Sequence, residues 1–132
     1  MRRLEWDSAF FGHAIGSATL PAETLAEATR EARAASIDCL YLFVPADQIG
    51  LINEAGAVGA RLVDLRTTLE MAVQPRPPSG LTRPATVADL PGLEQLARHL
   101  AAASRFRNDP RFAVERIEEM YGVWVRRCVE EG

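Results

Sequence analysis

Residues 74–80 contain three prolines, a serine and a glycine, and this segment constrains the fold more than any other part of the chain. Proline has no backbone N–H to donate and its φ is fixed, so neither a helix interior nor a central strand can run through such a segment. We therefore predict a proline-rich linker over 74–81. It separates an N-terminal domain at 1–73 from a second segment at 82–132.

The first domain carries the signals of strands alternating with helices. Residues 38–44 form a continuous apolar run that ends at Pro45, which is typical of a strand buried on both faces in a parallel or mixed sheet. An earlier apolar stretch, 15–20, ends at Pro21 and predicts another strand. Between them, apolar residues recur at three- and four-residue spacing over 21–36, which predicts a helix.

The rest of the first domain continues this alternation. Asp47 is placed to N-cap a helix that runs through Ala57, and Gly59 suits the helix end. Residues 61–73 then alternate, with Val63, Leu65 and the following odd positions forming a mostly apolar face, which predicts a long final strand. The predicted fold class is α/β, with a small β-α-β-α-β unit over 1–73.

The second segment predicts one short strand and two helices. Residues 82–86 are the candidate strand, and Asp89 as N-cap with Pro91 in the first turn predicts a helix from Leu90 to about Ala103. A polar loop over 104–110 precedes a second amphipathic helix over about 110–130, which contains Trp124. One strand offers little sheet for these helices to pack on, which indicates an incomplete domain.

Charge and composition exclude several classes of protein. The chain has 132 residues, a net charge of −3 and a pI of about 5.4, which disfavours nucleic-acid binding. No apolar run reaches the roughly 18 residues that a membrane span requires, so no membrane role is expected. Cys39 and Cys128 are far apart and there are only two histidines, so no metal is expected. We expect reduced thiols and a cytoplasmic location.

Arginine supplies all the positive charge, and two arginines flank an aromatic residue in the loop 104–109. Arg105 and Arg107 surround Phe106, and Asp109 follows. Guanidinium groups bind phosphate or carboxylate with two parallel hydrogen bonds, so this loop could hold an anionic or sugar-bearing ligand. The alternative is a helix connection in which Phe106 is a core residue and Asp109 caps the last helix.

Three aromatic residues, Trp6, Phe10 and Phe11, gather near the N-terminus. They form either a substrate platform or an aromatic plug that fixes the first strand, and aromatic clusters most often bury area. His13 follows them, but no second titratable group is placed to orient it, which favours a surface histidine.

The order of three motifs resembles that of a known family. The opening segment Leu-Glu-Trp-Asp-Ser-Ala-Phe-Phe-Gly at 4–12, Ala-Asp-Leu-Pro at 88–91, and Ser-Arg-Phe with Asp-Pro-Arg-Phe at 104–112 resemble the N-terminal part of two-domain GNAT acyltransferases of the dTDP-fucosamine N-acetyltransferase type. The resemblance spans nearly the whole chain. It implies a degenerate half-GNAT-like unit at 1–73, followed by the first strand and two helices of a GNAT domain at 82–132.

The resemblance also implies a reaction and a division of the site. Such enzymes hold acetyl-CoA on the backbone amides of an Arg/Gln-x-x-Gly-x-Gly/Ala turn. No segment of this chain fits that turn, so the acetyl-CoA site is expected in a further part of the parent protein. The family's general acid is expected in the same further part of the parent protein. No catalytic residue is therefore assigned here, and neither Tyr41 nor Tyr121 inherits that role. The resemblance assigns to this chain only the part of the site that binds the acceptor, with Arg105, Phe106 and Asp109 as substrate-binding residues.

The sequence therefore supports two functional hypotheses. The first is an N-terminal fragment of an acetyl-CoA-dependent N-acetyltransferase, which acts on a small-molecule amine or a nucleotide sugar and is inactive alone. The alternative is a non-catalytic protein-binding or dimerisation module, with a homodimer as one form, in which the aromatic N-terminus and the last helix bury surface against a partner.

Overall fold

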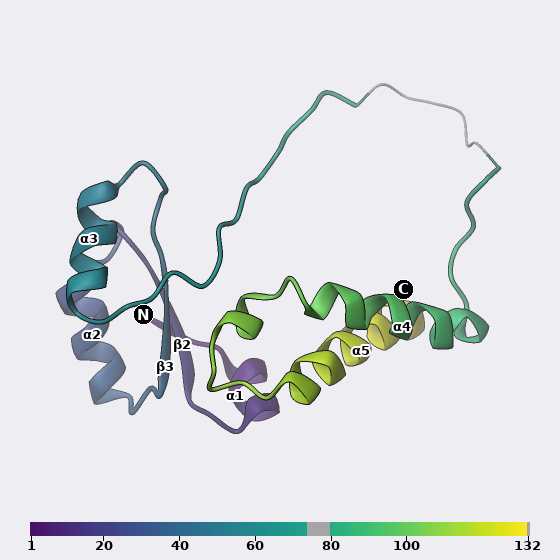
Figure 1. The fold of residues 1–132 in the computed structure, drawn as a ribbon, viewed down its shortest axis with the longest axis horizontal. Coiled ribbons are helices and arrows are strands. Elements are labelled where there is room, and N and C mark those ends of the chain that lie inside the picture. Colours follow the sequence, from purple (N-terminus) through teal and green to yellow (C-terminus); the bar gives the residue numbers. More distant parts are fainter. Residues whose placement is uncertain (74–79, 132) are drawn as a thin grey trace. The chain divides into compact units, whose positions relative to one another are not determined.

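The computed structural model describes residues 1–73 and 80–131, so the expected linker at 74–81 lies mostly outside the described residues. The chain forms two compact units, Met1–Leu62 and Val63–Gly132. Residues 63–73, which we expected in the first domain, group with the second unit. The fold class is mixed α/β, as the sequence predicts, with helices in both units and a three-stranded sheet in the first (Figure 1).

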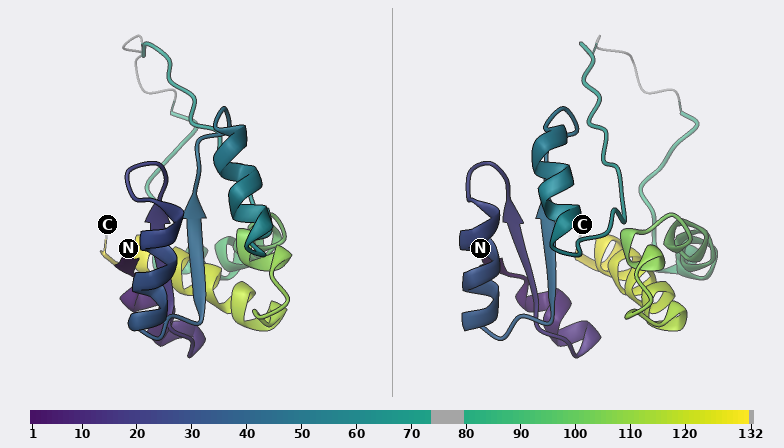
Figure 2. Two further views of the ribbon diagram at one scale, coloured as in Figure 1. Left: turned by 90° about the vertical axis from the view of Figure 1, so that its left-hand side faces the viewer. Right: turned by 60° about the vertical axis from the view of Figure 1, so that its left-hand side comes forward.

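Unit 1 is built on a mixed sheet in the order β1-β2-β3. Strand β2 pairs antiparallel with β1 and parallel with β3, with Ile15 opposite Cys39. Helices α2 and α3 lie on the same face of this sheet (Figures 1 and 2). The predicted strands at 15–20 and 38–44 and the predicted helices that follow them are confirmed. In chain order the elements are β1 (Arg2–Arg3), α1 (Glu5–Phe11), β2 (Ile15–Thr19), α2 (Leu25–Ala34), β3 (Cys39–Phe43) and α3 (Ile49–Ala57).

Helix α2 shows why the sequence folds locally as predicted. Thr24 and Glu27 form a capping box that satisfies backbone donors at the helix start. Two alanines one turn apart, Ala28 and Ala32, face inward and are 0% and 6% exposed. Small side chains also make up half of the rest of this core. Its buried apolar residues are Ile15, Ala18, Leu20, Ala28, Ala32, Cys39, Tyr41 and Ala55.

The aromatic N-terminal segment folds as helix α1, although its residues show no helical periodicity. Ser8 is the buried residue of this helix, and its Oγ donates to the Leu4 carbonyl at 2.6 Å and accepts from the Ile15 amide at 2.9 Å. Gly12 ends the helix with a φ of 71°, a conformation that glycine adopts without strain. A single serine therefore joins α1 to the first residue of β2.

Two expectations about helix caps and strands in the first domain are wrong. Asp47 does not cap α3, because the N-cap position is Gln48 and no side chain makes a cap hydrogen bond there. The final strand expected over 61–73 is absent, because none of these residues is in a strand. A lone extended segment gains no ladder hydrogen bonds, so period-two alternation alone does not make a strand. Its apolar side chains are exposed instead, with Leu65 at 72% and Leu69 at 89%.

Unit 2 is a pair of helices with short helical turns beside them. The elements are η1 (Val87–Asp89), α4 (Leu90–Ala101), η2 (Arg105–Asn108) and α5 (Val114–Glu131). The two predicted helices are confirmed, with Pro91 in the first turn of α4. The predicted strand at 82–86 is wrong, because none of these residues is in a strand. The core consists of Leu90, Ala97, Ala101, Phe106, Phe112, Ile117 and Met120.

Asp89 lies at the N-cap position of α4, but its side chain makes no cap hydrogen bond to that helix, contrary to expectation. Its carboxylate instead accepts from the amide and hydroxyl of Thr86 at 2.8 and 2.9 Å. It also accepts two hydrogen bonds from the Arg83 guanidinium, at 2.7 and 2.8 Å. These donors hold the pKa of Asp89 well below its usual range.

This arrangement predicts a defined dependence on pH. A lowered carboxyl pKa stabilises the fold at pH values above the unfolded pKa of about 3.9, and the contribution is lost as pH falls toward the lower folded pKa. We expect Asp89→Asn to melt at a lower temperature than wild type at pH 7, with the difference shrinking below about pH 4. Trp124 fluorescence in a Trp6→Phe background reports unit 2, since these are the only tryptophans in the chain.

The matched control is Glu131→Gln, because the Glu131 carboxylate forms an exposed ion pair with Arg127 at the other end of the unit. Exposed pairs of this kind contribute little to stability. A difference between Asp89→Asn and wild type that persists unchanged at pH 2 would contradict the assignment.

Across the described ranges, no helix is both long and apolar enough to cross a membrane. The same residues contain no group of three or more His, Cys, Asp or Glu side chains arranged to hold a metal ion. Neither cysteine forms a disulfide within the described part of the chain; Cys39 is buried and Cys128 is exposed.

Candidate functional site

The loop with the predicted substrate-binding residues folds as the short helix η2. Ser104 precedes it, and its Oγ accepts from the Phe106 amide at 3.3 Å. The Ser104 carbonyl accepts from Arg107 N–H at 3.0 Å, and the Phe106 carbonyl accepts from Asp109 N–H at 3.1 Å. These bonds turn the chain tightly between α4 and α5. As a result, Arg105, Phe106 and Asp109 project in different directions.

Phe106 is a core residue of unit 2. Its side chain is 1% exposed, and its ring meets that of Phe112 edge to face with centroids 5.0 Å apart. Such aromatic pairs are stabilising beyond the area they bury. The structure therefore gives Phe106 the place that the alternative interpretation of this loop predicts.

Asp109 is also buried, with 5% of its surface exposed. Its carboxylate accepts from the Arg111 amide at 3.1 Å and from the Arg111 guanidinium at 2.9 and 2.5 Å. The expectation that Asp109 is the N-cap of the last helix is wrong, because α5 begins at Val114. Asp109 instead closes the turn that leads to Phe112, whose amide donates to the Asp109 carbonyl at 3.1 Å.

Arg105 is half-buried and lies against the core aromatic next to it. Its guanidinium carbon is 4.4 Å from the centroid of the Phe106 ring, a distance at which a cation is attracted to the ring face. The three predicted residues are thus neighbours in the chain, but Phe106 faces the core, Asp109 faces Arg111 and Arg105 covers the Phe106 ring.

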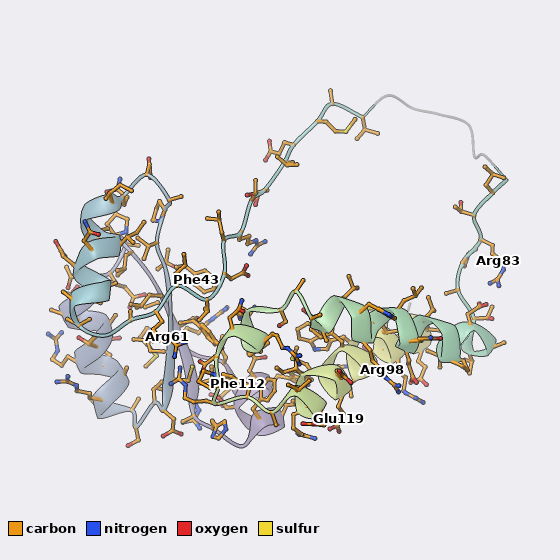
Figure 3. All side chains as sticks on the ribbon, viewed as in Figure 1. Phe43, Arg61, Arg83, Arg98, Phe112 and Glu119 are labelled. Atoms are coloured by element: carbon orange, nitrogen blue, oxygen red, sulfur yellow. The ribbon has the colours of Figure 1, made fainter. Side chains whose placement is uncertain are left out.

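A separate hollow lies between α4 and α5. It has a volume of about 50 Å³ and is lined by two arginines, one glutamate and four apolar residues. Arg98 comes from α4 (Figure 3), Arg107 from η2 and Glu118 from α5. The apolar wall consists of Ala101, Ala102, Val114 and Ile117.

The two arginines of this hollow differ from other arginines of unit 2. Arg83, Arg111, Arg116, Arg126 and Arg127 each form an ion pair with a carboxylate. Among the residues that the structure describes, Arg98 and Arg107 form none. Two guanidinium groups without a carboxylate partner, at one hollow, can accept an anionic group such as a phosphate or carboxylate.

An open groove of about 360 Å³ adjoins this hollow and shares Arg98 and Glu118 with it. Two of its carboxylates are already paired, Glu94 with Arg126 and Glu119 with Arg116. Glu115 and Glu118 have no such partner in the described part of the chain. The remaining lining residues are Gly122 and Val123.

The charged groups of α5 reach this groove because of their spacing. Glu115, Glu118 and Gly122 follow one another at intervals of three and four residues, which places them on one face of a helix. An added Cβ at Gly122 would meet nothing within 4 Å. The groove is therefore open at this glycine, and a larger side chain there would fill it.

Sequence reasoning did not identify Arg98, Glu115 or Glu118 as site residues. Charged residues at helical spacing are usually a solvated face, so their pattern carried no distinguishing signal. The groove exists because α4 packs against α5, and that pairing joins residues more than fifteen positions apart in the chain. Arg107 was noted in the loop, but its position beside Arg98 was not predictable.

Searches against family models, curated proteins and solved structures return no match for this chain.

Proposed function

We propose that this chain is the acceptor-binding part of a GNAT-type N-acetyltransferase that acts on a small-molecule or nucleotide-linked amine. The proposal rests on the order of the motifs at 4–12, 88–91 and 104–112, and one structural observation carries it further. The hollow and the adjoining groove between α4 and α5 are lined by two guanidinium groups, Arg98 and Arg107, and by two carboxylates, Glu115 and Glu118, that form no ion pair within the described residues. An amine that also bears a phosphate or carboxylate complements both.

The chemistry assigned to these side chains is binding and orientation. Arg98 and Arg107 would take the anionic group of the acceptor, and Glu115 and Glu118 would attract its ammonium. Holding the acceptor in one orientation lowers the entropic cost of attack on an acetyl thioester. Acetyl-CoA itself would bind to backbone amides of the family's turn in another part of the parent protein.

The proposal also includes the domain organisation of the chain. Residues 1–73 would be a degenerate half-GNAT-like unit that serves as scaffold, and residues 82–132 would contain the first two helices of a GNAT domain. Arg105 stays a candidate for contact with a nucleotide-sugar phosphate at the edge of η2. A cytoplasmic location with reduced thiols is part of this proposal as well.

Titration calorimetry with a nucleotide-linked amino sugar tests the acceptor role. We expect Arg98→Ala and Arg107→Ala each to weaken binding by about 10- to 100-fold, because charge-assisted hydrogen bonds contribute roughly 1.5–3 kcal/mol. Gly122→Leu should also weaken binding by filling the groove, without a loss of stability. Arg127→Ala is the matched control, since Arg127 lines neither the hollow nor the groove and already pairs with Glu131.

Two comparison ligands separate the charges of the acceptor. The same nucleotide sugar with a hydroxyl in place of the amine should lose the contribution of Glu115 and Glu118 and keep that of the arginines. A simple amine without phosphate should show the reverse. If the arginine variants bind the amino sugar as tightly as wild type does, the groove is not the acceptor site.

A separate titration with acetyl-CoA tests the reaction class. We expect no binding by residues 1–132 alone and binding by any longer natural form that contains the family's glycine-rich turn. Binding by the short chain would show that the cofactor site has been misplaced, and absence of binding by a longer form would end the acetyltransferase proposal.

A further inference from the structure

The hollow and the adjoining groove of unit 2 differ in size and in charge. The hollow has a volume of about 50 Å³, and its charged lining residues are Arg98, Arg107 and Glu118. Two arginines against one glutamate leave one positive charge in excess. A cavity needs roughly 10–15 Å³ to hold one water molecule, so the hollow accepts a group of only a few non-hydrogen atoms. A single carboxylate or phosphate group fits this size and this charge.

The groove is larger and acidic. Its volume is about 360 Å³, and four glutamates and two arginines line it, which leaves two negative charges in excess. Two of these glutamates already pair with arginines. Glu115 and Glu118 remain, and neither forms an ion pair within the described residues. The groove therefore attracts positively charged groups and repels anionic ones.

This division of charge indicates which acceptors fit. A nucleotide-linked amine carries its negative charges in its larger part, whereas here the basic cavity is the small one and the acidic cavity is the large one. Proteins commonly bind nucleobases by stacking them on aromatic rings, and none of the described residues that line either cavity is aromatic. A ligand with one small anionic group and a longer cationic part complements both cavities.

The two unpaired carboxylates differ in their position relative to the hollow. Glu118 lines both cavities together with Arg98, whereas Glu115 lines only the groove. The two glutamates are three residues apart on α5, a spacing that places Cβ atoms about 5–6 Å apart on one face of a helix. They can therefore bind two ammonium groups that a short chain separates, with the ammonium at Glu118 adjacent to the anionic group in the hollow.

We propose that the acceptor bound by unit 2 is a short diamino monocarboxylic acid rather than a nucleotide-linked amine. This inference rests on the proposed acceptor-binding function and names the class of its substrate. The carboxylate accepts charge-assisted hydrogen bonds from Arg98 and Arg107, and the neighbouring α-ammonium binds to Glu118. The methylene chain extends along the groove, and the terminal ammonium binds to Glu115.

Titration calorimetry of the full chain with ornithine tests this proposal against ligands that each lack one charged group. Putrescine lacks the carboxylate, norvaline lacks the terminal ammonium, and δ-aminovalerate lacks the α-ammonium. We expect ornithine to bind at least about tenfold more tightly than any of these, because hydrogen bonds to charged groups contribute about a factor of ten or more in affinity. Ornithine should also bind at least about tenfold more tightly than a nucleotide-linked amino sugar.

Substitutions in the two cavities should act selectively. Arg107→Ala should weaken the binding of ornithine by about tenfold or more without weakening that of putrescine, which has no group for the hollow. Glu115→Gln should weaken the binding of ornithine and putrescine and leave that of norvaline unchanged. Both side chains are exposed, so both variants should retain the fold. The matched control is Glu130→Gln, because Glu130 is an exposed residue of α5 that lines neither cavity.

The possible results separate this inference from the proposed function. Tighter binding of the nucleotide-linked amino sugar than of ornithine overturns the diamino acid as acceptor and leaves the acceptor role of the groove in place. Equal binding of ornithine and norvaline does the same, because the terminal ammonium then has no partner. If no amine binds, or if Arg107→Ala and Glu115→Gln act no differently from Glu130→Gln, the groove is not an acceptor site and both proposals fail.

Discussion

Replacement of Phe106 by alanine is expected to lower the free energy of unfolding of unit 2 by about 3–5 kcal/mol. The side chain is almost fully buried, and its ring contacts both Phe112 and the guanidinium of Arg105. The truncation removes these contacts and leaves a cavity in a small two-helix core. Few other single substitutions in this unit should have so large an effect.

The experiment follows Trp124 fluorescence in urea, in a chain whose Trp6 is replaced by phenylalanine. Phe106→Leu serves as the matched variant, because it keeps much of the apolar volume and should cost markedly less stability. If Phe106 were instead a wall of a ligand site, Phe106→Ala would leave the unfolding midpoint unchanged and reduce ligand binding. That outcome would contradict the core assignment.

Ser8→Ala is the second substitution with a large expected effect, and it acts on unit 1. The Ser8 hydroxyl is the acceptor for the amide of Ile15, a residue that is 0% exposed. A buried amide left without an acceptor costs about 1–3 kcal/mol. The same substitution removes the hydrogen bond to the Leu4 carbonyl, so α1 loses its side-chain link to the sheet.

Trp6 fluorescence in a Trp124→Phe background measures this change, since Trp6 lies on α1 and stacks on Phe10 with centroids 5.1 Å apart. Glu5→Ala is the control on the same helix, because the Glu5 side chain is 80% exposed and its pairing with Arg3 is weak. Equal unfolding midpoints for Ser8→Ala and Glu5→Ala would show that the serine does not hold α1 in place.

The sequence predicted the elements whose signals are local or periodic. The apolar run at β3 and the alanine spacing of α2 were sufficient to predict these elements, because each pattern marks a face that the fold buries. Helix α1 was not predicted, since its stability depends on Ser8 reaching Ile15 rather than on a repeating pattern. The expected strands at 61–73 and 82–86 were not found because a strand needs a neighbour, which a single segment cannot specify.

The candidate site shows the same limit. Arg105, Phe106 and Asp109 are predicted as substrate-binding residues from the loop's composition and the family resemblance, yet Phe106 and Asp109 serve the fold of that loop. The groove combines Arg98 of α4 with Glu118 of α5, and only the packing of the two helices makes them neighbours. For locating the site, the residue types in the sequence were therefore less informative than the contacts that each side chain makes in the structure.

The small side chains at the centre of unit 1 have a consequence for how this unit is kept folded. Alanines at 18, 28, 32 and 55 allow the helices to approach the sheet closely, but each contributes little apolar area. The free energy of unfolding of the unit alone is therefore low. The fraction of folded molecules responds strongly to whatever covers the sheet. By mass action, a partner that binds only the folded form raises the ratio of folded to unfolded chains as the concentration of that partner rises. The folding of unit 1 would thus be coupled to the concentration of any partner that covers its sheet.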